Sequence, residues 1–302
     1  MSLLVVGSIG LDTVETPYGK TDEILGGAAV YCGLGASFFA NVRLVGVVGD
    51  DFPEKHLALL RAQRLDLDGV EIKPGKTFRW GATYGADLNT RETRFTELNV
   101  FANFNPQIPE KYRDSQYVFL GNIGPELQLS VLEQIKQPRL VALDTMNYWI
   151  ERTPNELRKV LKRVDVLFVN DSETRALAED AHLVSAARRI REMGPKTIVI
   201  KKGEHGVLLS GSDGFFSAPA FPLENVCDPT GAGDTFAGGF MGHLAKAQRQ
   251  DEASFRQAAV CGSAMASFAC ERFGTERFQS LSEAEISQRV KAFHELTKFA
   301  LW

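Results

Sequence analysis

Short β-branched runs alternate with longer helical patterns along most of the chain. This alternation is typical of βαβ units arranged around a largely parallel sheet. Strands are predicted at Leu3–Val6, Val42–Val48, Tyr117–Leu120, Leu140–Leu143, Val164–Val169 and Thr197–Lys201. Helices are predicted at Ala28–Phe39, Pro53–Arg64, Glu126–Lys136, Pro154–Arg163 and Ser185–Met193.

The segment from Thr77 to Asp87 has a different pattern, because apolar residues alternate strictly with polar residues and glycine. That alternation predicts a strand with one wet face. The apolar members are Phe78, Trp80, Ala82, Tyr84 and Ala86. A turn at 88–90 and a second extended run at 91–97 complete a predicted hairpin outside the parallel sheet. By itself the pattern fits a plain antiparallel edge as well as a lid.

The C-terminal third predicts three successive helices, at 231–247, 251–270 and 282–297, which would cover one face of the sheet. No repeat, low-complexity segment or linker divides the chain. We therefore expect one domain over residues 1–302, with an excursion at about 77–97.

Composition excludes several classes of protein. The net charge is −4, from 34 basic and 38 acidic residues, and no run of like charges marks a surface for nucleic acid or anionic membranes. Four cysteines at unrelated spacings indicate neither a disulfide framework nor a zinc site. Gly7 interrupts the apolar N-terminus, and the longest nearly apolar stretch, 258–270, is too short to span a bilayer. A small-molecule partner and a cytoplasmic location are expected.

The strongest chemical signal is the run CDPTGAGDTFAGG, residues 227–239. Gly231, Ala232 and Gly233 have little or no side chain, so their backbone N–H groups can approach an anion at the positive end of the helix that follows. Asp234, in the first turn, is placed to accept a proton from an attacking hydroxyl. Thr230 is the predicted N-cap. A bare GxGD would fit a tightly packed helix start with a capping aspartate equally well.

The full run resembles the second signature of the ribokinase-like family of carbohydrate kinases, the PfkB family. The resemblance implies that Asp234 is the catalytic base and that the amides of Gly231, Ala232 and Gly233 form an anion hole for the phosphoryl group. It also places Thr230 at the nucleotide. A potassium ion beside the 228–230 backbone, with Asp228, is a further implication, since many relatives hold one.

Other segments match the same family over nearly the whole chain. Residues 7–12 resemble its first strand, whose closing aspartate, here Asp12, holds substrate hydroxyls. Gly26 and Gly27 resemble the first signature, where the pair lets substrate lie against backbone. Residues 45–52 resemble a VGxVGxDxxG stretch, which we interpret as structural.

Asn170 and Glu173 fit the family's NxxE element. Residues three apart at a helix N-terminus share one face, so both can orient the waters of a Mg²⁺ ion bound to ATP phosphates. Taken alone, the same four residues are a good helix cap. Gly203 and Gly206 match a GxxG turn against the nucleotide, whereas no GxxxxGK[ST] or complete GxGxxG occurs.

Two departures from the family pattern concern the acceptor. Tyr31 replaces the asparagine of GGxxxN, and Gly121-Asn122 stands where ribokinases often carry an acidic residue. A bidentate amide is lost and an aromatic ring gained, which argues against ribose itself as the substrate.

The sequence is identified as that of a ribokinase-like α/β kinase with a small β lid. We expect it to transfer the γ-phosphoryl group of MgATP to a hydroxyl of a sugar or sugar-like alcohol. Three alternatives stay open: a nucleoside acceptor stacked on an aromatic residue, a sugar phosphate held by lid arginines, and a silent sensor. The aromatic candidates are Tyr31, Phe78 and Trp80, and the lid arginines are Arg79, Arg91 and Arg94. Relatives also form dimers through their lids, and the apolar face of 78–86 allows a homodimer here.

Overall fold

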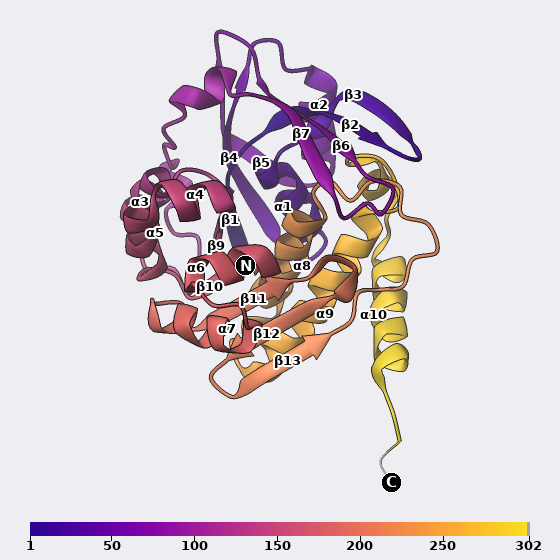
Figure 1. Cartoon of the computed structure of the whole chain (residues 1–302). Helices are drawn as coiled ribbons and strands as arrows, with labels where there is room; N and C mark the ends of the chain where they lie inside the picture. Colours follow the sequence, from indigo (N-terminus) through magenta and orange to yellow (C-terminus); the bar gives the residue numbers. More distant parts are fainter. Residues whose placement is uncertain (301–302) are drawn as a thin grey trace.

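The computed structural model describes residues 1–300 and contains a nine-stranded sheet in the order β13-β12-β11-β10-β9-β8-β1-β4-β5 (Figure 1). Neighbours from β5 to β11 pair in parallel, and β12 and β13 add an antiparallel edge. The strands are β1 (Ser2–Val6), β4 (Asn41–Gly49), β5 (Leu65–Lys73), β8 (Tyr117–Leu120), β9 (Leu140–Asp144), β10 (Val166–Asn170), β11 (Thr197–Lys201), β12 (Val207–Gly211) and β13 (Gly214–Ala218). The predicted mainly parallel sheet is confirmed.

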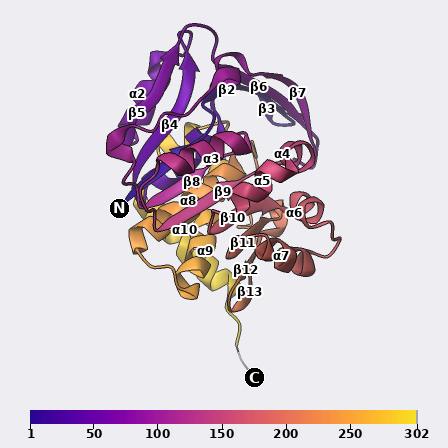
Figure 2. The same ribbon diagram turned by 90° about the vertical axis from the view of Figure 1, so that its left-hand side faces the viewer.

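Helices cover both faces of this sheet (Figure 2). Leu3 and Val5 of β1 belong to one core and Leu4 and Val6 to the other, because successive side chains of a strand point to opposite faces. The first core packs on α1 (Ala28–Ser37), α2 (Glu54–Ala62), α8 (Ala232–Ala247), α9 (Glu252–Ala269) and α10 (Glu283–Thr297). The second core packs on α3 (Pro125–Gln134), α4 (Asn147–Arg152), α5 (Pro154–Leu161), α6 (Asp171–Ala178) and α7 (Leu183–Glu192).

Helix α8 lies unusually close to its neighbours. A Cβ on Gly238 would lie 2.1 Å from the carbonyl oxygen of Cys32 in α1, and one on Gly239 would lie 3.0 Å from the carbonyl oxygen of Cys261 in α9. A Cβ does not fit at the first distance, and at the second it fits only if the neighbouring helix shifts. The last two glycines of the 227–239 run therefore serve packing, and they fix where α8 begins.

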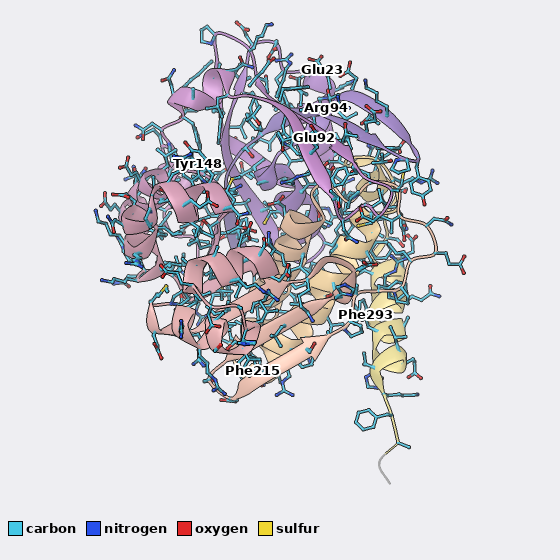
Figure 3. The ribbon with its side chains drawn as sticks, viewed as in Figure 1. Glu23, Glu92, Arg94, Tyr148, Phe215 and Phe293 are labelled. Atoms are coloured by element: carbon cyan, nitrogen blue, oxygen red, sulfur yellow. The ribbon has the colours of Figure 1, made fainter. Side chains whose placement is uncertain are left out.

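A second sheet of four strands, in the order β3-β2-β6-β7, overhangs the start of α8 (Figure 1). Its strands are β2 (Gly10–Thr16), β3 (Gly19–Gly26), β6 (Phe78–Tyr84) and β7 (Arg91–Glu97). The predicted hairpin is present as β6 and β7, paired antiparallel, while β2 and β3 were not predicted. The exposed side chains of Glu23, Glu92 and Arg94 lie over this sheet (Figure 3).

All four cysteines are free thiols. The longest helix, α9, contains most of the apolar 258–270 stretch. Within residues 1–300, none of the helices combines the length and the apolar character that crossing a membrane requires.

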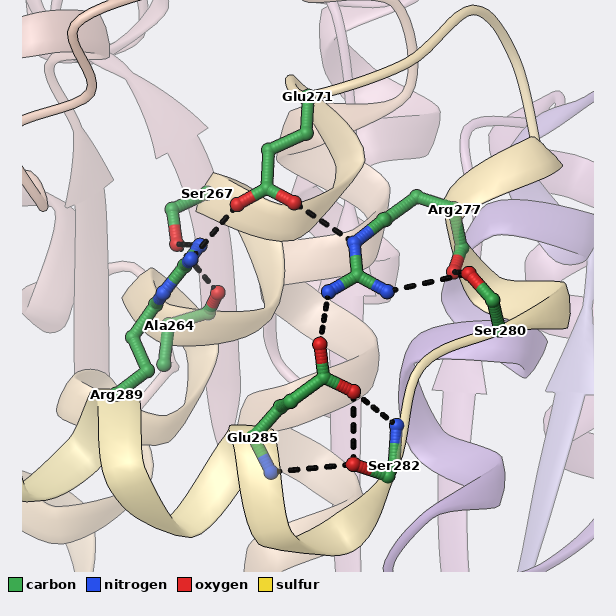
Figure 4. Close-up of polar contacts among 8 residues, drawn as sticks. All are labelled: Ala264, Ser267, Glu271, Arg277, Ser280, Ser282, Glu285 and Arg289. Atoms are coloured by element: carbon green, nitrogen blue, oxygen red, sulfur yellow. Dashed lines mark hydrogen bonds and ion pairs between the residues drawn. The ribbon is translucent and has the colours of Figure 1, made fainter.

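A network of ion pairs joins the end of α9 to α10 and the short 3₁₀ helix η4 (Glu276–Gln279) (Figure 4). Arg277 bonds Glu271 at 2.7 Å and Glu285 at 2.6 Å, and Arg289 bonds Glu271 at 2.7 Å. The network encloses the loop 271–275. Within that loop the N–H of Gly274 donates to a carboxylate oxygen of Asp228 at 3.0 Å, so α10 braces the chain just before α8.

We predict that Glu271→Gln lowers the free energy of unfolding by roughly 2 kcal/mol, because it leaves two largely buried guanidinium groups without their shared carboxylate. Urea unfolding measures this loss. Glu54→Gln is the control, since it breaks a solvent-exposed pair with Arg61 and should cost about 0.5 kcal/mol or less. Equal losses in the two variants would contradict the bracing role.

Candidate active site

The glycine-rich run forms a turn of backbone ahead of α8, which we call the cradle (residues 230–233). Gly231 has a φ of 72°, and a Cβ there would lie 2.3 Å from the ring of Tyr31, so this position requires glycine. The N–H groups of Gly231 and Gly233 have no partner in the described part of the chain, whereas that of Ala232 donates to the carbonyl of Pro229 at 3.2 Å. Two free N–H groups at a helix N-terminus suit a phosphate.

The prediction that Thr230 caps α8 is wrong, because the N-cap is Gly231 and has no side-chain bond. Thr230 is held elsewhere. Its N–H donates to Asp228 at 2.8 Å and its hydroxyl donates to the phenol oxygen of Tyr84 at 3.1 Å. These two bonds hold the cradle in place, because one ties it to Asp228 in the preceding loop and the other ties it to Tyr84 in the second sheet.

Asp234 lies in the first turn of α8, beside the cradle. Desolvation by the surrounding protein, and next the charge of Asp144, raise the pKa of Asp234 to about 7, while Lys201 and Arg91 act in the opposite direction. A carboxylate with a pKa near the working pH is well matched to general-base catalysis.

Three parallel strands end beside one another with polar residues: Asp144 on β9, Asn170 on β10 and Lys201 on β11. Lys201 Nζ bonds Asp144 Oδ2 at 2.7 Å. Neither Asp144 nor Lys201 was among the predicted site residues. The available signal was a charged residue at the carboxyl end of a buried parallel strand, which is where open α/β sheets bind ligands.

Asn170 and Glu173 form a capping box at the start of α6. Asn170 Oδ1 accepts the N–H of Glu173 at 2.7 Å, and Glu173 Oε2 accepts the N–H of Asn170 at 2.7 Å. Burial, and next the charge of Asp144, raise the pKa of Glu173 to about 7. The cap thus holds the buried carboxylate of Glu173 near the charges of Asp144 and Lys201.

Oxygen donors at this place fit a magnesium ion that keeps most of its waters and is shared with ATP phosphates. No group of three or more His, Cys, Asp or Glu side chains able to hold a metal ion is found within residues 1–300. Glu173 Oε1 is the carboxylate oxygen that the capping box does not use.

Asp12 belongs to β2 in the second sheet, and β1 ends at Val6, so the expectation that Asp12 closes the first strand is wrong. The chain crosses between the sheets after Ile9. Asp12 is buried, and its Oδ1 has no hydrogen-bond partner in the described residues. Burial, then the charges of Asp228 and Asp234, raise the pKa of Asp12 to about 8. An unpaired buried carboxylate oxygen is costly and is therefore typical of a ligand contact.

Gly26 and Gly27 enclose Asp12. A Cβ on Gly26 would lie 2.0 Å from Asp12 Oδ2, and Gly27 has a φ of 102° as the N-cap of α1. Asp12 could not keep its place beside a larger residue at position 26.

Tyr31 lies behind the cradle, with its ring against Gly231 and only 1% of its surface exposed. Its hydroxyl has no partner in residues 1–300, and burial followed by the charge of Asp12 raises its pKa. The ring packs behind Gly231 of the cradle and is too enclosed to stack on a base.

Hydrogen bonds join the second sheet to the cradle side of the molecule, among them one from Thr16 of β2 to the carbonyl of Cys227 at 3.0 Å. Tyr84 reaches Thr230, and Asn89 in the hairpin turn donates to Glu204 at 2.9 Å. Glu204 lies in η3 (Gly203–His205), next to Gly206, whose φ is 81°. The hairpin is therefore closed over the sheet end as a lid.

Arg91 projects from this lid towards the acidic cluster. Its guanidinium lies 5.3 Å from the centre of the Trp80 ring. Its charge lowers the pKa of both Asp234 and Glu173, so the two groups feel a cation from the lid.

Comparison with known proteins gives one family. The protein-family model described as "pfkB family carbohydrate kinase" matches residues 3–281 of the chain. A cytidine kinase from Thermococcus kodakarensis is 34% identical over 260 residues, 83% of this chain and 91% of that protein. An adenosine kinase from Saccharomyces cerevisiae is 33% identical over 258 residues, 76% of this chain and 74% of that protein. The fold resembles that of a Burkholderia thailandensis nucleoside kinase in complex with inosine, with a TM-score of 0.81, 20% identity and coverage of 98% and 99% of the two chains.

We predict that kcat/KM falls about tenfold per pH unit below pH 7 and is flat just above it, because Asp234 must be ionised to accept a proton and its pKa is about 7. A pH–rate profile tests this.

Asp234→Asn should keep the thermal midpoint and lose roughly 10²–10⁴-fold in kcat. A stable variant with near-normal turnover would exclude Asp234 as the base.

We predict that Asp12→Asn stabilises the free protein, increasingly so as pH rises. The pKa of Asp12 is raised from 3.8 to about 8 in the folded state, so its proton favours folding at low pH and that contribution is lost as pH rises through 8. Thermal midpoints at pH 5 and pH 9 measure the difference. Asp213→Asn, at an exposed turn, is the control and should show no such trend.

Proposed function

The chain belongs to the pfkB family of carbohydrate kinases, and from that membership we propose that it phosphorylates a hydroxyl on the sugar of a nucleoside. It is an ATP-dependent kinase whose acceptor is a sugar-like alcohol. The observation that carries the narrower proposal is the 34% identity with a cytidine kinase over 91% of that enzyme.

In the proposed reaction, Asp234 accepts the proton of the acceptor hydroxyl. The γ-phosphoryl group lies on the free N–H groups of Gly231 and Gly233 in the cradle, which stabilise the charge on its oxygens, whereas the N–H of Ala232 is held by the carbonyl of Pro229. Asn170 and Glu173 would hold the waters of a magnesium ion, which would supply positive charge to neutralise the phosphates of ATP. Thr230, Gly203 and Gly206 line the nucleotide.

The acceptor binds on the other side of the cradle. Asp12 accepts hydrogen bonds from two sugar hydroxyls, which supplies the partners that its buried carboxylate lacks. Gly26 and Gly27 let the sugar approach backbone, and Tyr31 forms the floor. The pocket thereby recognises a ring with adjacent hydroxyls.

Trp80 is the residue we propose for the base. It is half-buried and shares the inward face of β6 with Ala82 and Tyr84, both buried. Phe78 is less suited, because its ring already packs on Phe101, with ring centres 5.4 Å apart.

A sugar phosphate is a poorer candidate acceptor, because two of the three lid arginines already have partners. Arg79 bonds Glu23 at 2.6 Å and Asp51 at 2.8 Å, and Arg94 donates to Thr83 at 2.8 Å. Arg91 alone faces the site.

We also propose a potassium ion beside the 228–230 backbone. Asp228 is fully buried, and its two oxygens hold this loop against Gly274, which would order the loop's carbonyl groups around an ion. The cytoplasm, with four free thiols, remains the proposed compartment.

A homodimer through the lid remains a prediction. Ala82 and Tyr84 are buried within one chain, so a lid contact would use another face of the hairpin, where Phe95 is 38% exposed.

We predict that the best nucleoside exceeds ribose and fructose in kcat/KM by roughly 10–100-fold, the contribution of one base stacked on an aromatic ring. ADP release with cytidine, adenosine, inosine, ribose, fructose and ribose 1-phosphate tests this. Trp80→Leu should reduce the advantage without changing turnover of free sugars. Tyr148→Leu, an exposed aromatic residue on α4, is the control. A free sugar that outperforms every nucleoside would overturn the nucleoside proposal.

A further inference from the structure

Lys201 reaches across the end of one strand to find its partner. It ends β11 and Asp144 ends β9, with β10 between them, and the Nζ–Oδ2 distance is 2.7 Å. The side chains of Lys201 and Asp144 are 19% and 7% exposed. Withdrawing both charges from water is costly, and an apolar pair would close the sheet end at least as well. Stability alone therefore does not explain why this ion pair is present.

The same ammonium group lies against the cradle. A Cβ on Gly233 would lie 3.2 Å from Lys201 Nζ, so glycine at this position leaves room for the ammonium. Of the three N–H bonds of Lys201, only one has an acceptor among residues 1–300, the carboxylate of Asp144. An anion on the N–H groups of Gly231 and Gly233 would lie beside the other two.

The surroundings are strongly acidic. Asp144, Glu173 and Asp234 converge here, and the pKa values of Glu173 and Asp234 are raised partly by the charge of Asp144 and lowered by that of Lys201. A phosphoryl group entering without a fixed cation would meet repulsion from all three carboxylates. Arg91 belongs to the second sheet, whereas Lys201 belongs to the central sheet that carries Asp144.

We propose that Lys201 is a catalytic residue that binds the oxygens of the transferring phosphoryl group, and that Asp144 is a positioning residue that aims the Lys201 ammonium at the cradle. The proposal rests on the kinase reaction and not on which alcohol is the acceptor.

In the transfer step, the proton of the acceptor hydroxyl goes to Asp234 as the acceptor oxygen forms its bond to the γ-phosphorus. The bond from that phosphorus to the oxygen bridging the β-phosphate breaks, and its electron pair leaves with ADP. Lys201 stays protonated throughout and stabilises the charge spread over the three equatorial oxygens.

The test compares Lys201→Met, Asp144→Asn and the double variant with the wild type. Lys201→Met should lower kcat roughly 10²–10³-fold, as expected for losing one charge-stabilising donor, with the acceptor KM nearly unchanged. It should weaken a non-hydrolysable ATP analogue about tenfold and leave ADP affinity unchanged, since only ATP has a γ-phosphoryl group. Asp144→Asn should lower kcat by about tenfold, because the ammonium remains but is less well oriented.

The double variant separates catalysis from folding. Each single variant leaves one buried charge without its partner and should lower the thermal midpoint. The double variant removes both charges of the pair, so its thermal midpoint should lie closer to that of the wild type while its kcat stays low. Lys196→Met is the control, because Lys196 forms a 2.9 Å pair with Asp165 just before β11 and β10, at the opposite end of the sheet, where the lysine is exposed. Its kcat and nucleotide affinities should equal those of the wild type.

Recovery of turnover in the double variant would overturn the proposal and make the pair a structural one. Equal weakening of the ATP analogue and ADP by Lys201→Met would overturn it as well. The nucleoside proposal fails separately, because these ratios can be measured with whichever sugar or nucleoside the wild type phosphorylates.

Discussion

The position of helix α8 is the constraint on which the site depends. Gly238 lets its backbone meet that of α1 at a distance where no Cβ fits, and Gly239 lets it approach that of α9 closely. The helix is thereby fixed as a rigid body, and with it the direction of the free N–H groups at its start. Below it, Asp228 ties the incoming loop to Gly274, which is braced in turn by the ion pairs of α10. An anion site built on backbone gains its selectivity from such rigidity, because the donors do not reorganise when charge develops.

Near the start of α8 the protein buries several ionisable groups whose burial makes the folded state less stable. Asp12 and Tyr31 have buried oxygens without partners, and the pKa values of Asp12, Glu173 and Asp234 are all raised above the usual range for carboxyl groups. Desolvation is the largest cause in each case. A bound ligand would supply the hydrogen bonds and opposite charges that these groups lack in the free protein. Part of the binding energy would therefore come from removing the cost of burying these groups without partners.

The lid connects the two halves of the reaction. Strand β2 supplies Asp12 to the acceptor side, and β6 and β7 supply Tyr84 and Arg91 to the phosphate side, all within one four-stranded sheet. Closing the lid thus brings acceptor contacts and a cation to the cradle together. Exclusion of water in the closed state strengthens each of these interactions.

The sequence by itself determined the elements whose pattern is local. Buried parallel strands such as β8 and β11 were predicted at their observed bounds, and the glycine-rich run marked the start of α8 and the position of Asp234. Strands β2, β3, β5, β12 and β13 were missed. They lie in the second sheet or at or near the edges of the main sheet, and the polar residues of a strand such as β3 leave no apolar periodicity. Only the tertiary structure decided that Asp12 belongs to the lid sheet, that Tyr31 packs under Gly231, and that Lys201 reaches Asp144 and Gly233. These contacts join residues that are far apart in the chain, and sequence periodicity records only which face of an element is buried, not which residue it meets.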